Sequence, residues 1–68
     1  MELLQQIEDL VCGKAKLSES ENRIYVEFTG IKNAYTLKEF MAKNGFVDVY
    51  GAYTDGVYTL GFKDGELS

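Results

Sequence analysis

Asp55 and Gly56 constrain the fold of this chain more than any other pair of neighbouring residues. Both accept positive φ, and an Asp-Gly pair between alternating apolar residues is typical of a two-residue turn joining antiparallel strands. The turn places Thr54 opposite Val57, and every further pair between residues 46 and 63 follows from it. One face of this hairpin is then mostly apolar, and we interpret it as core: Val47, Val49, Gly51, Tyr53, Tyr58, Leu60 and Phe62.

The other face of the hairpin mixes apolar and polar side chains. Strict alternation puts Asp48 opposite Lys63, and this pair of opposite charges supports the predicted register. The face is too apolar for an ordinary surface and too polar for a core, so a binding partner is expected on it. Its members are Asp48, Tyr50, Ala52, Thr54, Val57, Thr59, Gly61 and Lys63.

A second hairpin is predicted between Gly13 and Phe28, across a turn at residues 19–22. The alternative is that residues 13–18 prolong the preceding helix, but Lys14 would then lie on the apolar stripe of that helix, so we favour a strand. Both faces of the hairpin then pair well. The expected pairs are Leu17 with Ile24, Ala15 with Val26, Lys14 with Glu27, and Lys16 with Tyr25.

One helix is predicted before each hairpin. The first has a single apolar face and should stop at Gly13, and its apolar residues are Leu3, Leu4, Ile7, Leu10 and Val11. The second is predicted from Leu37 to about Asn44, because Thr36 and Glu39 have the spacing of a capping box and Gly45 can end the helix. Tyr35 and Phe40 have the spacing of a hydrophobic staple, and the expected inward residues are Leu37, Phe40 and Met41.

This order of elements predicts an α+β fold, a two-layer sandwich in the order α-β-β-α-β-β. Its sheet should be mostly antiparallel, with both helices on one face and the other face open. Residues 1–63 should form a single domain, followed by a frayed tail at residues 64–68. The order resembles the core of the LAGLIDADG homing endonucleases. The matching segment, Leu10 to Gly13, lacks the terminal carboxylate that would bind a metal, so nuclease activity is not expected.

Composition narrows the chemistry. The chain has no histidine and a single cysteine, Cys12, so neither an internal disulfide nor a Cys/His zinc site is expected. No motif of a nucleophile, phosphate loop or converging carboxylates is present, and we expect neither catalysis nor a cofactor. No apolar run approaches the length of a membrane span and the amino terminus is acidic, so a cytoplasmic protein without membrane contact is expected.

We predict that the open face of the sheet binds another protein, or a second copy of the chain in a homodimer, because tyrosine is enriched at binding surfaces. A plain β-surface that favours tyrosine and threonine is the alternative. Direct nucleic-acid binding is not expected of a chain with a net charge of −4. By analogy with the small acidic proteins that viruses, including phages, and mobile elements use as inhibitors, an inhibitor of this type is expected. The predicted binding residues are Arg23, Tyr25, Glu27, Tyr50, Val57 and Thr59.

Two other functions are considered. Carboxylates could imitate DNA phosphates and block a basic groove, although solubilising surface charge explains the same residues: Glu2, Glu8, Asp9, Glu19 and Glu21. A small molecule such as a nucleotide could instead bind between sheet and helices, where the tyrosine hydroxyls of Tyr35, Tyr53 and Tyr58 would line the pocket.

Overall fold

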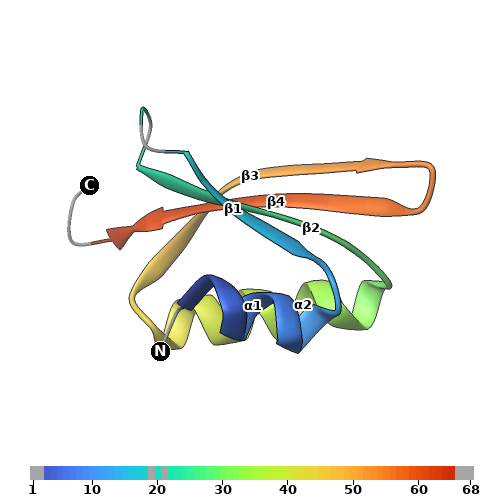
Figure 1. Ribbon diagram of the computed structural model, residues 1–68, viewed down its shortest axis with the longest axis horizontal. Helices are drawn as coiled ribbons and strands as arrows, with labels where there is room; N and C mark the ends of the chain where they lie inside the picture. Colours follow the sequence, from blue (N-terminus) through green and yellow to red (C-terminus); the bar gives the residue numbers. More distant parts are fainter. Residues whose placement is uncertain (1–2, 19, 21, 66–68) are drawn as a thin grey trace.

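The computed structural model describes residues 3–18, 20 and 22–65. The four strands form one antiparallel sheet in the order β1-β2-β4-β3, and both helices cover the same face of it (Figure 1). The predicted two-layer α+β fold is therefore confirmed. Its elements are α1 (Leu3–Val11), β1 (Lys14–Ser18), β2 (Arg23–Thr29), α2 (Ile31–Lys43), β3 (Phe46–Thr54) and β4 (Val57–Asp64).

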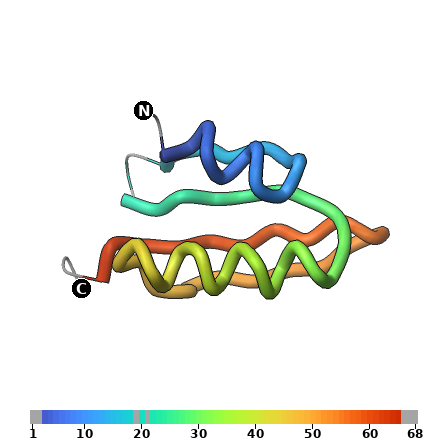
Figure 2. Tube along the Cα trace, turned by 90° about the horizontal axis from the view of Figure 1, so that it is seen from below, coloured from blue at the N-terminus to red at the C-terminus, as the bar shows by residue number. Residues whose placement is uncertain are grey.

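The core lies between the two layers. Seen from the helix side, α1 runs along the β1 and β2 half of the sheet and α2 along the β4 and β3 half (Figure 2). Each helix thus belongs to one edge of the sheet. The buried apolar residues come from both helices and the two central strands: Ile7, Val11, Ile24, Val26, Phe28, Ala34, Leu37, Met41, Leu60 and Phe62.

The first hairpin has the register that the sequence predicts, with Leu17 opposite Ile24 and Lys14 opposite Glu27. Residues 14–18 are a strand, so the alternative of a longer first helix is wrong. The helix ends at Val11, because Cys12, one residue before the predicted stop at Gly13, takes the left-handed conformation with φ 53°. Gly13 has a different role. A Cβ at this position would collide with the carbonyl oxygen of Glu27, so only glycine lets the connection approach β2.

The second helix begins six residues earlier than predicted. It starts at Ile31 after Gly30, whose φ is 93°, and Thr36 lies exposed within it, so the predicted capping box and staple are wrong. The physical reason is that Ala34 extends the buried stripe of Leu37 and Met41 backward by one turn. The predicted end is confirmed, since Gly45 has φ 83° and its amide donates to the carbonyl of Ala42.

The second hairpin follows the predicted register only as far as Tyr50. Asp55 and Gly56 form the expected turn with positive φ, but a register shift between Asp48 and Tyr50 moves the rest of β3 by one residue. Asp48 therefore lies opposite Phe62 and not Lys63, and Val47, expected in the core, lies opposite Lys63 and is 41% exposed. The extra residue of this β-bulge is what strict alternation could not predict.

The carboxyl-terminal end of β4 includes Asp64, and the amide of Gly65 donates to the carbonyl of Gly45 over 2.8 Å. Residues 66–68 of the predicted tail lie outside the described residues. Within the described ranges, no helix is long and apolar enough to cross a membrane.

Candidate functional site

The open face is the side of the sheet that the helices leave uncovered, and two tyrosines meet at its centre. The rings of Tyr25 on β2 and Tyr50 on β3 are 5.8 Å apart between centroids and stand nearly perpendicular, at 79°. Gly61 on the intervening strand makes this contact fit, because a Cβ there would lie 2.8 Å from the Tyr25 ring and 2.9 Å from Cβ of Tyr50. The pair is thus built from three strands over one glycine.

Positive charge surrounds the tyrosine pair. Cross-strand pairing places the following basic residues on the open face: Lys14, Lys16, Arg23 and Lys63. The lysine and arginine side chains therefore outnumber the carboxylates on this face. In the described part of the chain, the carboxylate of Glu27 is the only one on it. The bulge in β3 increases the imbalance, since it turns Asp48 toward α2, where its Oδ2 lies 3.5 Å from Nζ of Lys38.

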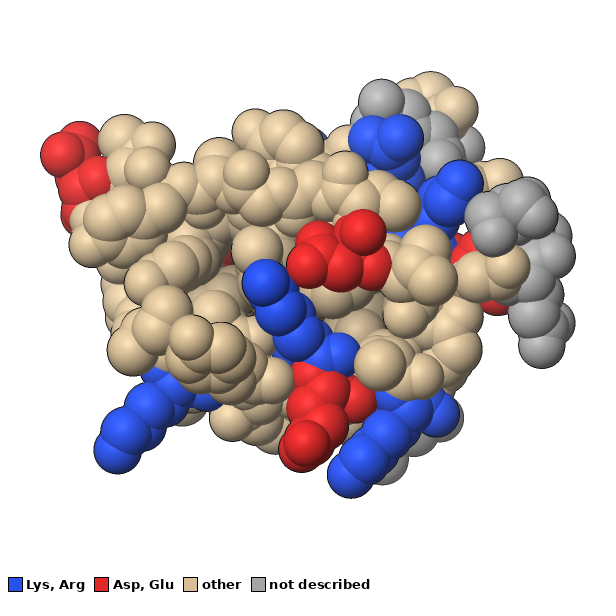
Figure 3. All heavy atoms as spheres, turned by 180° about the vertical axis from the view of Figure 1, so that it is seen from behind, with Lys and Arg blue, Asp and Glu red and all other residues tan. Residues whose placement is uncertain are grey.

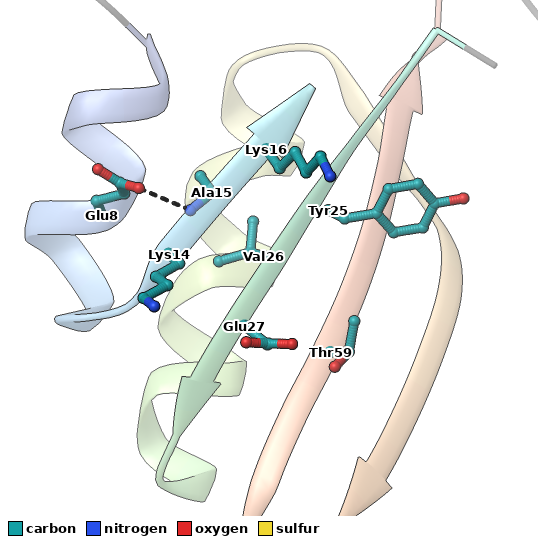
Figure 4. A pocket seen from close by; sticks show the side chains of 8 residues that line it. All are labelled: Glu8, Lys14, Ala15, Lys16, Tyr25, Val26, Glu27 and Thr59. Carbon is teal, nitrogen blue, oxygen red and sulfur yellow. Dashed lines mark hydrogen bonds between the residues drawn. The ribbon is translucent and has the colours of Figure 1, made fainter. Parts of the chain in front are cut away.

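A shallow hollow of about 550 Å³ opens beside the tyrosine pair (Figure 4). Tyr25 and Thr59 form one wall, and Nη1 of Arg23 is 3.4 Å from the Tyr25 hydroxyl oxygen, to which it donates. The hollow offers aromatic, cationic and hydroxyl groups close together. Its lining is Glu8, Lys14, Ala15, Lys16, Tyr25, Val26, Glu27 and Thr59.

The structure brings most of the predicted binding residues together. Arg23, Tyr25 and Tyr50 are in one cluster, and Glu27 lies opposite Thr59 on the neighbouring strand. Val57 lies on the same face but at the far end of β4, opposite Thr29. The predicted set omitted the three lysines and the glycine of the cluster. Alternation and hairpin pairing already placed these lysines on the open face. The strand order β1-β2-β4, which the sequence did not predict, brings Lys16 and Lys63 to the two sides of β2.

Two of the carboxylates proposed as phosphate mimics, Glu8 and Asp9, lie in the described residues, and each accepts a hydrogen bond within the chain. Oε2 of Glu8 accepts a hydrogen bond of 2.9 Å from the backbone amide of Ala15, so this carboxylate binds a backbone group of the edge strand β1. Oδ1 of Asp9 accepts a hydrogen bond of 3.0 Å from the side-chain Nε2 of Gln5 on the same helix. Glu2, Glu19 and Glu21 lie outside the described residues.

A second surface lies between α2 and β3. Tyr35, Tyr53 and Tyr58, predicted to line a pocket between sheet and helices, do line one groove, with a volume of about 320 Å³. Tyr53 is 62% exposed and Tyr35 69%, because the β3–β4 hairpin reaches beyond the end of α2 (Figure 1). Seen from the β3 and α2 side, residues other than Lys, Arg, Asp and Glu cover most of this region (Figure 3). We call it the α2–β3 groove.

In the residues that the structure describes, no three His, Cys, Asp or Glu side chains are close enough to hold a metal ion. Cys12 is exposed at the end of α1. Comparison with known proteins finds no family model, curated protein or solved structure that matches the chain.

Proposed function

We propose that this chain is a non-catalytic protein-interaction module, of the inhibitor type that viruses and mobile elements use, which binds an acidic patch of a partner protein on its open face. The observation that carries the proposal is the Tyr25–Tyr50 pair, fixed over Gly61 and surrounded by Lys14, Lys16, Arg23 and Lys63. Aromatic residues and arginine are the types most enriched at the centres of protein interfaces.

Charge supports an acidic partner over a second copy at this face. Each open face contributes four basic residues and one carboxylate, that of Glu27. Two open faces placed against each other would therefore bring eight basic groups together with only two carboxylates. Like charges opposed in this way disfavour association. An acidic protein surface would instead gain steering from the lysines and contact area from the tyrosines.

Apolar residues on the same face support a protein over a nucleic acid. Beyond the tyrosines, the β3 and β4 half carries Val47, Ala52 and Val57, with exposures of 41% for Val47 and 36% for Val57. Such side chains suit the apolar part of a protein interface, whereas phosphate binding requires continuous positive charge. The net charge of −4 further weakens non-specific binding to DNA or RNA.

The test is affinity capture from a nuclease-treated cell lysate with the immobilised chain. Replacing Tyr25 and Tyr50 by serine should abolish capture, while Leu17→Ser, which removes an exposed apolar residue from the helix-facing side of β1, should leave it intact. Exchanging Lys14 and Lys16 for glutamine should weaken capture about tenfold or more, because the rim charges steer binding. The matched control is the same exchange at Lys32 and Lys43 on α2, which changes the net charge equally.

Two results would overturn the proposal. One is an unchanged set of captured proteins after the tyrosine exchange. The other is tight binding of a fluorescent single-stranded oligonucleotide that the tyrosine exchange removes, since that would make the face a base-stacking platform. Location in the cytoplasm is part of the proposal, because the exposed thiol of Cys12 suits a reducing compartment.

A further inference from the structure

We infer that the chain forms a two-fold symmetric homodimer through the exposed edge of β3, with the α2–β3 groove of each copy covered by the other. This inference concerns a different surface from the open face and does not depend on the function proposed for that face. In the strand order β1-β2-β4-β3, the two edge strands of the sheet are β1 and β3. An edge strand offers backbone groups to another strand unless something covers or charges it.

The backbone of β3 is directed outward at Gly51 and Tyr53. The two-residue turn makes Thr54 and Val57 the closing hydrogen-bonded pair, so the N–H and C=O groups of Thr54, Ala52 and Tyr50 point toward β4. Those of the intervening Gly51 and Tyr53 point away from β4. No charged residue and no proline occurs from Val49 to Thr54. This segment lacks the usual protection of an edge.

One register makes this segment complementary to itself. If Ala52 lies on the two-fold axis, Gly51 pairs with Tyr53 of the second copy, and Tyr50 lies opposite Thr54 of that copy. The pairing then stays between the bulge at Asp48/Tyr50 and the turn at Asp55 in both copies. An axis through Gly51 would instead pair Tyr53 with Val49 inside the bulge. The axis through Ala52 is therefore the favoured one.

Side chains also fit this register. A Cβ at Gly51 would have 3.6 Å to its nearest neighbour, a methyl carbon of Leu60, so the space above the glycine is open. The ring of Tyr53 of the second copy would fill that space. The chain already uses the same arrangement internally, where the ring of Tyr25 on β2 covers Gly61, the residue opposite it on β4. Covering a sheet glycine by a cross-strand aromatic ring is a known stabilising arrangement.

The charges and the buried area agree with a second copy as the occupant. In this register Asp55 of one copy lies opposite Val49 of the other, beside the Lys38–Asp48 ion pair, so a lysine is placed between two carboxylates. Ile31 is 52% exposed. If the second copy covers Ile31, Tyr35, Tyr53 and the strand edge, about 500 Å² is buried on each copy. The total of about 1,000 Å² is at the lower limit of specific interfaces, so the dimer should dissociate on dilution.

Analytical ultracentrifugation tests the inference over a range of concentrations. The wild-type chain should shift from monomer to dimer between about 1 μM and about 1 mM. Tyr53→Lys should remain a monomer throughout, because it adds a charge to the pairing edge. Leu17→Lys is the matched control: it adds the same charge to a half-exposed position on the other edge strand, and should dimerise like the wild type.

Disulfide trapping tests the register. In a background of Cys12→Ser, Ala52→Cys should form a covalent dimer under mild oxidation, because residue 52 lies opposite itself with Cβ atoms about 5 Å apart. Thr54→Cys is the control, since its opposite residue is Tyr50 of the second copy and not another Thr54. It should be trapped at least about tenfold more slowly.

The inference is overturned if the wild type stays monomeric at all concentrations, or if both cysteine variants are trapped equally. It is also overturned if ATP raises the melting temperature of the wild type but not of Tyr53→Lys while the mass stays that of a monomer, because the groove would then bind a small molecule. Partner capture by monomeric Tyr53→Lys keeps this outcome separate from the fate of the open-face proposal.

Discussion

The two edge strands of the sheet, β1 and β3, differ in how their outward backbone groups are protected from pairing with another strand. At β1 the carboxylate of Glu8, on the adjoining helix, accepts a hydrogen bond from the backbone amide of Ala15, and two lysines flank Ala15 on the strand. At β3 the adjoining helix reaches the strand through the ion pair of Lys38 and Asp48, and the remaining stretch to Thr54 is uncharged. Charge and a backbone hydrogen bond discourage strand addition, so β1 is closed to pairing and β3 is available for it.

The difference separates two kinds of surface in a very small protein. A chain of 68 residues buries a small core and has little stability to spare. The β1 edge is covered by the chain's own helix, whereas the β3 edge is left for the second copy that we infer, so the same sheet can be stable and still pair with another chain. The open face, bounded by both edges, then remains accessible to a third molecule.

The largest effect is expected from exchanging Gly13, which immediately precedes β1, for alanine. Gly13→Ala should cost about 3 kcal/mol, because the new Cβ meets the backbone oxygen of Glu27, which cannot move away like a side chain. That cost is comparable with the whole stability of a domain of this size. Urea unfolding followed by circular dichroism measures it.

Gly51→Ala is the matched change at the β3 edge. Its Cβ would find ordinary contact with Leu60 at 3.6 Å, so the free energy of unfolding of the monomer should stay within about 0.5 kcal/mol of the wild-type value. Equal losses for the two alanine variants would show that the edges are not built differently, and would break the comparison.

A smaller effect is expected at Glu8. Glu8→Ala removes the acceptor of the Ala15 amide and should lower stability by about 1.5 kcal/mol, since a hydrogen bond to a charged group is lost. Glu8→Gln keeps an acceptor oxygen and should lose about 0.5 kcal/mol. Hydrogen exchange at the Ala15 amide should accelerate in the alanine variant more than in the glutamine variant. The same exchange rate in both would mean that Glu8 does not close this edge.

The length of α2 can be tested at Thr36, and it matters because Ile31 and Tyr35 form a wall of the α2–β3 groove. Within a helix, alanine is favoured over threonine, so Thr36→Ala should raise stability by about 0.6 kcal/mol. At a helix cap the same change would lower stability by about 1 kcal/mol. The sign of the change in the urea midpoint therefore decides where the helix begins.

Most of the fold could be predicted because local signals agreed with one another. The turn at Asp55 and Gly56 and the alternation of Ile24, Val26 and Phe28 specify both hairpins. The start of α2 could not be predicted in this way. A capping-box pattern at Thr36 and Glu39 competed with an apolar stripe that begins at Ala34, and burial of the stripe in the core prevails over a cap.

The candidate site was predictable in part. Tyr25 and Tyr50 were found from alternation, but their contact depends on the strand order, which places the glycine of β4 between them. The bulge before Tyr50 left no signal in the pattern, since an inserted residue shifts the faces without changing the residue types. The charge of the open face was therefore underestimated, because Asp48 was assigned to it.

The ion pair of Lys38 and Asp48 should give the smallest effect and the clearest contrast with Glu8. Both side chains are nearly half exposed, at 49% and 43%, so a double-mutant cycle with alanine should yield a coupling of about 0.3 kcal/mol. Salt at about 1 M should abolish this coupling, because it reduces the screening length to about 3 Å. The loss in Glu8→Ala should persist at the same salt concentration, since it concerns a short, partly buried hydrogen bond. If salt reduced both effects equally, Glu8 would act as a surface charge, and the β1 edge would be no better closed than the β3 edge.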